Sequence, residues 1–332
     1  MTFIESGYAR NEPAIDRRRS DGDSLEIGLV NNMPDSALEA TERQFRALLS
    51  LAGGGISVRL THYAMPDVPR SESGRRHVSQ SYSDIDALWD TRLDGLIVTG
   101  TEPRVSNLKE EPYWESLTRV IDWAEYQTHS TVFSCLAAHA AVLHLDGIIR
   151  RPLADKRFGV FKCARVSDHR LTAAAPSEIR MPHSRWNDVS YEALSACGYR
   201  VLTRSEGAGV DTFVKQGKSL FVFFQGHPEY EAETLLLEYR RDIRRFLCRE
   251  RETYPIMPAG YFDELTVEAL TALRERALAD RREELMADFP TALLARTVVN
   301  TWRTASASIY RNWLLHLCAQ KERRQRARAF LA

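Results

Sequence analysis

Short apolar segments alternate with segments of helical period in the first half of this chain, and the alternation limits the folds open to it. Four segments rich in β-branched or aromatic residues indicate strands: 25–30, 56–61, 95–99 and 131–134. Apolar residues recur at helical spacing in 38–51 and 113–125. Strands that alternate with helices form a parallel sheet covered on both faces, and ligands bind at the carboxyl ends of its strands. We therefore predict an α/β fold with functional loops at 33–39, 100–108 and 134–138.

The remaining segments predict the organisation of the rest of the chain. Residues 62–90, with Pro66, Pro69 and a Ser/Arg-rich stretch, indicate a long surface connection. Further elements are expected in this order: strands at 200–203 and 219–224, a helix over 231–249, and a charged helical hairpin inserted at 263–289. The predicted parts are a polar N-terminal arm over 1–24, the α/β domain over 25–250, and a C-terminal helical extension over 251–332 that packs on the same domain. The basic segment 319–330 is expected to be a solvated helix end.

Charge and cysteine content exclude several classes of protein. Lys plus Arg and Asp plus Glu both number 45, so electrostatics gives no case for a nucleic acid or an anionic membrane as partner. The five cysteines form no C-x-x-C pair, which argues against a disulfide framework or a zinc site and for a reducing compartment. No apolar run has the length of a signal peptide core or a membrane span. We expect a soluble, cytoplasmic protein without a metal.

Cys135 stands where the segment 131–134 runs into an alanine-rich helix. A thiol at such a turn lies at a helix N-terminus, where the helix dipole favours the reactive thiolate. The Leu136 N–H would then be one oxyanion donor. A single cysteine is more often buried and inert, so the prediction of a nucleophile depends on a second segment.

That second segment is the apolar strand ending at Gly226, which is followed by His227, Pro228 and Glu229. An imidazole can take the proton of a nucleophile, and a carboxylate can orient that imidazole and stabilise its charged form. Together the two segments predict a Cys135–His227–Glu229 triad.

The order of cysteine and His-Pro-Glu resembles the class I glutamine amidotransferases, which implies their flavodoxin-like parallel sheet flanked by helices. Their nucleophile is flanked by glycines, whereas Ser134, Leu136 and Ala137 stand here, which argues against glutamine hydrolysis. A closer resemblance covers nearly the whole chain. The sequence is similar to the homoserine O-succinyltransferase/O-acetyltransferase family of methionine biosynthesis, which has a glutaminase-like fold. The matching segments include 32–34, 41–45, 94–100, 113–114, 182–185, 226–230, 302–303 and 312–313.

The resemblance implies a ping-pong reaction without a bound cofactor. Cys135 would take the acyl group from acyl-CoA as a thioester, and His227, completed by Glu229, would activate the hydroxyl of L-homoserine. Arg241 could fork onto the amino-acid carboxylate, and Ser184 could hydrogen-bond the polar end of the substrate. The family's substrate-binding positions correspond to Lys156, Ser184 and Arg241. The partners are then small molecules, and a homodimer is compatible with this interpretation.

Two loops depart from the family pattern. Family members commonly carry lysine after the Met-Pro of the first loop, where Asp35-Ser36 stands here. The position that sorts acyl donors, usually Gly in succinyl users and Glu in acetyl users, aligns with Arg104. A guanidinium pairs with a carboxylate, which favours succinyl-CoA over acetyl-CoA, although Glu102 lies two residues away and Arg104 could equally face solvent or the CoA phosphates. The alternatives are an acetyl-CoA or serine-type variant of this chemistry, an amidotransferase-like cysteine hydrolase, and a non-catalytic binding protein on the same fold.

Overall fold

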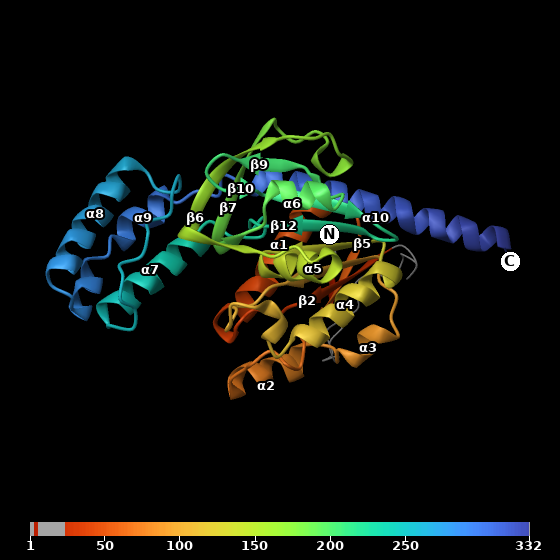
Figure 1. Cartoon of the computed structure of the whole chain (residues 1–332), viewed down its shortest axis with the longest axis horizontal. Coiled ribbons are helices and arrows are strands. Elements are labelled where there is room, and N and C mark those ends of the chain that lie inside the picture. The colour runs from red at the N-terminus through yellow and green to blue at the C-terminus, as the bar shows by residue number, and fades with distance from the viewer. Residues whose placement is uncertain (1–2, 6–23, 332) are drawn as a thin grey trace, which may run out of the picture.

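An eight-stranded sheet forms the centre of the molecule, in the order β1-β3-β2-β4-β5-β12-β11-β8 (Figure 1). The structure is a computed structural model that describes residues 3–5 and 24–331. The strands are β1 (Phe3–Glu5), β2 (Leu25–Val30), β3 (Val58–Tyr63), β4 (Gly95–Thr99), β5 (Ser130–Ser134), β8 (Arg200–Val201), β11 (Thr212–Gln216) and β12 (Leu220–Phe224). The six strands from β1 to β12 run parallel, and β11 and β8 are antiparallel. The predicted arm over 1–24 lies outside the described residues except for 3–5 and Ser24.

Helices cover both faces of this sheet, as the alternating pattern predicted. One face packs against α1 (Leu38–Gly53) and α10 (Arg303–Leu331), with the rings of Phe45, Tyr310 and Trp313 fully buried. The other face packs chiefly against α4 (Trp114–Gln127) and α5 (Leu136–Asp146). Short helices occur in the connections: η1 (Asp35–Ala37), η2 (Leu108–Glu110), η3 (Arg170–Thr172) and α6 (Tyr191–Ala196).

The segment 62–90 is not the plain surface connection that the sequence predicted. It contains α2 (Glu72–Ser81) and α3 (Asp86–Trp89). Ser71 caps α2, because its hydroxyl accepts a hydrogen bond from the Gly74 N–H at 3.2 Å. Gly74 is the only buried residue of α2, so this helix lacks the apolar stripe by which a sequence reveals a helix.

A second sheet of four antiparallel strands lies beside the carboxyl edge of the first, in the order β10-β9-β6-β7. Its strands are β6 (Arg151–Arg165), β7 (Glu178–Asp188), β9 (Thr203–Ser205) and β10 (Gly209–Val210). The sequence did not predict the β6–β7 hairpin, because the first half of β6 is charged and mostly exposed. The predicted strand at 200–203 divides between the two sheets.

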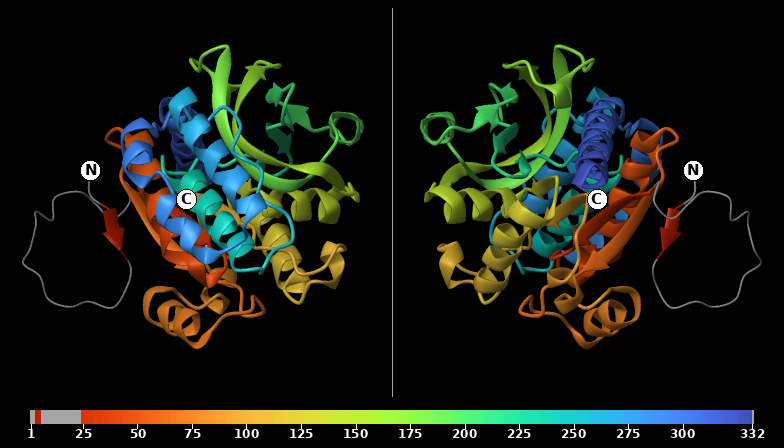
Figure 2. Two further views of the ribbon diagram at one scale, coloured as in Figure 1. Left: turned by 90° about the vertical axis from the view of Figure 1, so that its left-hand side faces the viewer. Right: turned by 90° about the vertical axis from the view of Figure 1, so that its right-hand side faces the viewer.

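The residues from 251 onward occupy two places. The first part forms α8 (Glu264–Ala279), η4 (Glu283–Asp288) and α9 (Thr291–Thr297), which pack with α7 (Thr234–Leu247) and β6 around a third apolar cluster. Where a hairpin was predicted at 263–289, the structure has one helix followed by a 3-10 turn. The second part, α10, runs back across the sheet and ends on the opposite side of the molecule (Figures 1 and 2). Among the described residues, no helix is both long and apolar enough to cross a membrane.

Candidate active site

The register of the parallel sheet brings the predicted functional loops to one place. Ser134 at the end of β5 pairs with Thr99 of β4 on one side and with Phe224 of β12 on the other. The residues that follow these strands therefore emerge side by side. Gly100, Cys135 and Gly226 begin or lie in those loops.

Cys135 occupies the turn between β5 and α5, with φ 52° and ψ −112°. A residue with a Cβ rarely adopts a positive φ, and such strain persists only where the surroundings hold it. Here the Cys135 N–H donates to the Phe224 carbonyl at 2.8 Å, and the Cys135 carbonyl accepts from the Ala138 N–H at 3.0 Å. The turn places the half-buried thiol at the N-terminus of α5.

The loop after β4 lies directly on this helix N-terminus. A Cβ added to Gly100 would lie 3.0 Å from the Leu136 nitrogen and 3.1 Å from the Ala137 nitrogen. Only glycine permits so close an approach of the two backbones. This loop therefore packs against one side of the Leu136 N–H, which is the predicted oxyanion donor.

His227 and Glu229 are both buried, and His227 Nδ1 is hydrogen-bonded to Glu229 Oε1 at 2.8 Å. The charge of Cys135 also acts on the His227 side chain. Burial opposes a charge on the imidazole, but the negative charges of Cys135 and Glu229 outweigh it and raise the pKa of His227 to about 10. The backbone N–H of His227 donates to the Pro182 carbonyl at 2.8 Å. The predicted triad thus has a hydrogen-bonded His227–Glu229 pair and a thiol whose charge acts on that imidazole.

Tyr230 stacks on the imidazole of His227, with ring centroids 4.1 Å apart and an interplanar angle of 15°. The Tyr230 carbonyl accepts hydrogen bonds from Trp302 Nε1 at 2.9 Å and Asn300 Nδ2 at 3.1 Å. Trp302 is fully buried and belongs to the C-terminal extension. Residues beyond 251 therefore reach the predicted general base. The family match covered Tyr230 and Trp302, but the sequence alone gave them no role.

A second polar cluster joins the substrate-binding positions that the resemblance implied. Glu238 Oε1 contacts Lys156 Nζ and accepts a hydrogen bond from Ser184 Oγ at 2.7 Å. Arg241 Nη2 lies 3.9 Å from the same oxygen and 2.8 Å from Asp242 Oδ1. Burial raises the pKa of Glu238, but Lys156 and Ser184 outweigh it and hold this pKa below its ordinary value. Sequence reasoning missed Glu238, although it lies three residues before Arg241 on one face of α7.

Both clusters act electrostatically on Tyr230. Burial raises its pKa, and so do the negative charges of Glu238, Glu229 and Cys135, while Arg241 lowers it; the pKa of Tyr230 ends well above its ordinary value. The triad and the Glu238 cluster thus act on one half-buried side chain.

Arg104 is exposed, on the loop after β4. Its backbone N–H and that of Val105 donate to Glu111 Oε1 at 2.5 and 2.9 Å. The buried Glu111 carboxylate therefore fixes the loop, and the Arg104 side chain is left exposed.

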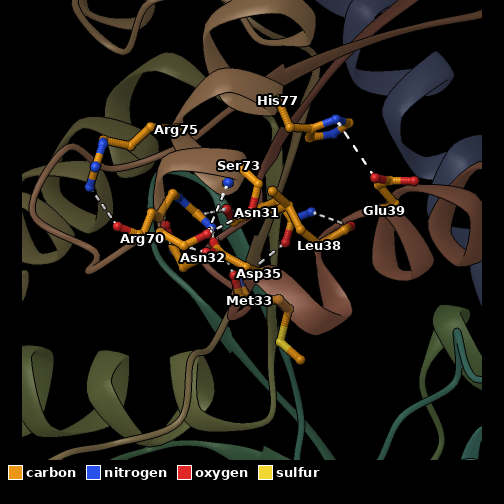
Figure 3. A network of polar contacts seen from close by, with 12 residues as sticks. Asn31, Asn32, Met33, Asp35, Leu38, Glu39, Arg70, Ser73, Arg75 and His77 are labelled. Atoms are coloured by element: carbon orange, nitrogen blue, oxygen red, sulfur yellow. Dashed lines mark hydrogen bonds and ion pairs between the residues drawn. The ribbon is translucent and has the colours of Figure 1, made fainter.

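Asp35, which departs from the family pattern, binds residues just before the start of α2 (Figure 3). Its carboxylate accepts a hydrogen bond from the Ser71 N–H at 2.7 Å and lies 3.3 Å from Arg70 Nη1. Arg70 also donates to the carbonyls of Met33 and Asn31, both at 3.1 Å. The pair thus ties the loop after β2 to the start of α2.

One group of possible metal ligands occurs among the described residues: Cys163, His183 and Asp211, whose ligand atoms lie within 4.8 Å of one another. The Asp211 carboxylate already accepts hydrogen bonds from Thr203 and Thr212, at 2.7 and 2.8 Å. Burial raises the pKa of the Cys163 thiol, which opposes its use as a thiolate ligand. A Cβ added to Gly226 would lie 2.7 Å from Asp211 Oδ1, so we interpret the group as a buried support of the His227 turn.

Comparison with known proteins gives a consistent set of relatives. A family model described as homoserine O-succinyltransferase matches residues 12–324. The homoserine O-succinyltransferase of Rhodopseudomonas palustris is 50% identical over 296 residues, which cover 89% of this chain and 89% of that protein. The protein of the same name from Bradyrhizobium japonicum is 45% identical over 324 residues, 96% of this chain and 99% of that protein.

Solved structures resemble the chain in fold. The glutamine amido transferase from Methylobacillus flagellatus superposes with a TM-score of 0.50 at 13% identity, covering 89% of this chain and 95% of that one. At this identity the likeness concerns architecture alone. It confirms the predicted glutamine amidotransferase-like fold.

Proposed function

The chain belongs to the homoserine O-succinyltransferase family of acyltransferases, and on that premise we propose that it transfers the succinyl group of succinyl-CoA to the hydroxyl of L-homoserine. The observation that carries the proposal is the buried, hydrogen-bonded His227–Glu229 pair, on which the charge of Cys135 at the N-terminus of α5 acts. A cluster that contains both positive and negative side chains supports it. The triad would activate the Cys135 nucleophile, and the charged cluster would bind the charged groups of an amino acid.

In the first half-reaction, the Cys135 thiolate attacks the carbonyl carbon of the donor thioester. The Leu136 N–H would stabilise the oxyanion, since it lies at the N-terminus of α5. The bond to the CoA sulfur then breaks, and the His227 imidazolium protonates the leaving thiolate. The product is a succinyl thioester on Cys135. One thioester replaces another, so the step is close to neutral in free energy.

In the second half-reaction, neutral His227 removes the proton from the homoserine hydroxyl, and the oxygen attacks the thioester carbonyl. Glu229 orients the imidazole through Nδ1 and stabilises the charge it gains. Cys135 leaves as the thiolate, and the ester product departs.

The Glu238 cluster would hold the amino-acid end of homoserine. Its two cations, Lys156 and Arg241, and its two carboxylates, Glu238 and Asp242, can pair with a substrate that carries one charge of each sign. Arg241 is half exposed and can turn onto the α-carboxylate, while Ser184 and Glu238 face the α-ammonium. Arg104 is exposed, which suits a contact with the CoA phosphates at the mouth of the site better than one with the acyl group.

The test is the donor half-reaction alone. Protein incubated with succinyl-CoA and no acceptor should gain one succinyl group on the peptide that contains Cys135, as measured by mass spectrometry. Homoserine added afterwards should remove the label as the O-succinyl ester. Cys197→Ala is the matched control, because this cysteine is also half-buried and should keep the label. Labelling at another residue, a kinetic requirement for a ternary complex, or ammonia release from glutamine would contradict the proposal.

A further inference from the structure

Arg150 follows the C-terminus of α5 and reaches the loop that overhangs Cys135. Its Nη2 donates to the Ser106 carbonyl at 3.1 Å and approaches the Val105 carbonyl at 3.5 Å. The same loop begins at Gly100, which lies against Leu136 beside the nucleophile. Arg150 and Cys135 therefore border one loop from two sides.

The guanidinium of Arg150 is half-buried and lacks a close counter-ion. Within residues 24–331, the hydrogen bonds of its side chain go to those two carbonyls, and it forms no ion pair there. Glu111 acts on it electrostatically without forming an ion pair, and Glu111 Oε1 accepts two backbone N–H groups. Withdrawing a cation from water is costly unless an anion compensates it. The site is therefore suited to an incoming negative charge.

Other shielded cations of the molecule are compensated. Arg70 lies against Asp35, Lys156 against Glu238, and Arg185 against Asp188. Arg150 differs from these three cations because its hydrogen-bond partners are neutral backbone carbonyls.

Among the charged groups that act on Arg150, Cys135 is the one that takes part in the proposed reaction. Burial lowers the pKa of Arg150, while Tyr113, Glu111 and Cys135 offset part of that effect. The nucleophile and the guanidinium thus interact electrostatically, and the loop after β4 contacts both Arg150 and the N-terminus of α5.

We propose that Arg150 receives the terminal carboxylate of the succinyl group as it passes from CoA to Cys135, an inference that rests on the proposed function. In a succinyl thioester this carboxylate is two methylene groups from the reacting carbonyl, a span of roughly 4 Å. An anion there gives Arg150 a direct ion pair, which its two carbonyl partners do not provide. An acetyl group would leave it without one, so Arg150 selects the charged donor.

Arg104 is the natural comparison, because it lies on the outer side of the same loop and is exposed. An exposed guanidinium is screened by water, so its pairing with a carboxylate discriminates little between donors. Arg150, being less exposed, interacts more strongly with the same charge.

The experiment compares succinyl-CoA with butyryl-CoA, which has the same chain length but a methyl group in place of the carboxylate. The rate of thioester formation on Cys135 is measured by rapid quenching and mass spectrometry in wild type, Arg150→Gln, Arg150→Lys and Arg104→Gln. Glutamine can still donate to the Ser106 carbonyl, which keeps the loop anchored.

We expect Arg150→Gln to lower kcat/KM for succinyl-CoA by about 10- to 100-fold, the effect of losing a charge-assisted hydrogen bond, with less than about a 3-fold change for butyryl-CoA. Arg150→Lys should fall between the two, and Arg104→Gln should keep the wild-type ratio of the two donors. Equal loss with both donors, or an unchanged ratio in Arg150→Gln, would overturn the inference. Failure of wild type to form any acyl-Cys135 would instead refute the proposed function.

Discussion

The triad and the Glu238 cluster both act electrostatically on Tyr230, yet they are held by different forces. The triad is held by the backbone: β5 and β12 are in register, the Cys135 N–H is bonded to Phe224, and the His227 N–H is bonded to Pro182. The Glu238 cluster is held by side-chain charges that come from β6, β7 and α7.

This difference predicts which property each region loses when one of its side chains is substituted. A change of side chain in the triad should remove chemistry and leave the fold intact, because the backbone bonds remain. A change in the Glu238 cluster should leave the chemistry of Cys135 intact and disturb recognition of the acceptor. Charged side chains form that pocket, and the amino-acid end of the proposed acceptor is charged as well.

The largest effect should come from replacing the nucleophile. Cys135→Ala and Cys135→Gly should both abolish transfer, since no other thiol is paired with His227. Glycine has no Cβ to strain the positive φ of this turn, so Cys135→Gly should be the more stable of the two by about 1 kcal/mol. Urea unfolding measures the difference. Equal stabilities would show that the turn is not strained.

The next largest effect should come from Glu229→Gln, which keeps the shape of the side chain but removes its charge. Transfer should fall by about 100- to 10,000-fold, because the imidazolium is less stabilised and less well oriented. NMR titration of the His227 ring should give a pKa below that of wild type, where it is raised to about 10.

The stability of the protein should follow the same titration. The folded pKa of His227, about 10, lies above the ordinary 6.5, so its charged form stabilises the fold fully below pH 6.5. This contribution is lost as the pH rises toward 10. Because Glu229→Gln lowers the folded pKa of His227 toward 6.5, the free energy of unfolding should decline over a narrower pH range than in wild type. An unchanged dependence of this free energy on pH would contradict the assignment of Glu229 as the carboxylate partner.

A smaller and more selective effect is expected from Glu238→Gln. This change leaves Lys156 without its buried partner, so KM for homoserine should rise by about 10- to 100-fold. Formation of the Cys135 thioester should stay within about 3-fold of wild type, since the donor half-reaction does not use the cluster. Glu178→Gln is the matched control, because Glu178 also pairs with a lysine but on the exposed surface. Equal losses in both half-reactions would erase the distinction between the two regions.

The smallest effect should come from Trp302→Phe. The ring still fills the core, but the donor to the Tyr230 carbonyl is lost, so turnover should fall by about 5-fold. The change should appear in kcat and in the pH profile, because the stacked imidazole shifts. A fall in unfolding temperature without any change in these two readouts would mean that Trp302 is purely structural.

The triad edge could be predicted from sequence because each of its parts is local. A β-branched or aromatic run marks each strand, and the loops that follow parallel strands of one sheet must meet. Cys135, His227 and Glu229 were found in this way, and the family match added Lys156, Ser184 and Arg241.

What the sequence did not reveal depends on distant partners. Glu238 is defined by contacts with residues 82 and 54 positions away along the chain, for which no local pattern exists. The helix α2 is polar except for Gly74 and Val78, and its start is fixed by Ser71 and by Asp35 of η1. The β6–β7 hairpin escaped prediction because β6 begins with a mostly exposed segment, 151–155, in which no residue is fully buried.

The position of α10 has a consequence for how the chain matures in the cell. This helix covers the face of the sheet formed by Leu25, Ile27 and Val132, which are made far earlier than Trp313 and Leu317. A growing chain thus carries an uncovered apolar surface until its last described helix has left the ribosome. Folding must then close the sheet and set the His227 turn together, after synthesis rather than piece by piece, and nascent chains stalled before residue 302 should depend on chaperones and remain inactive.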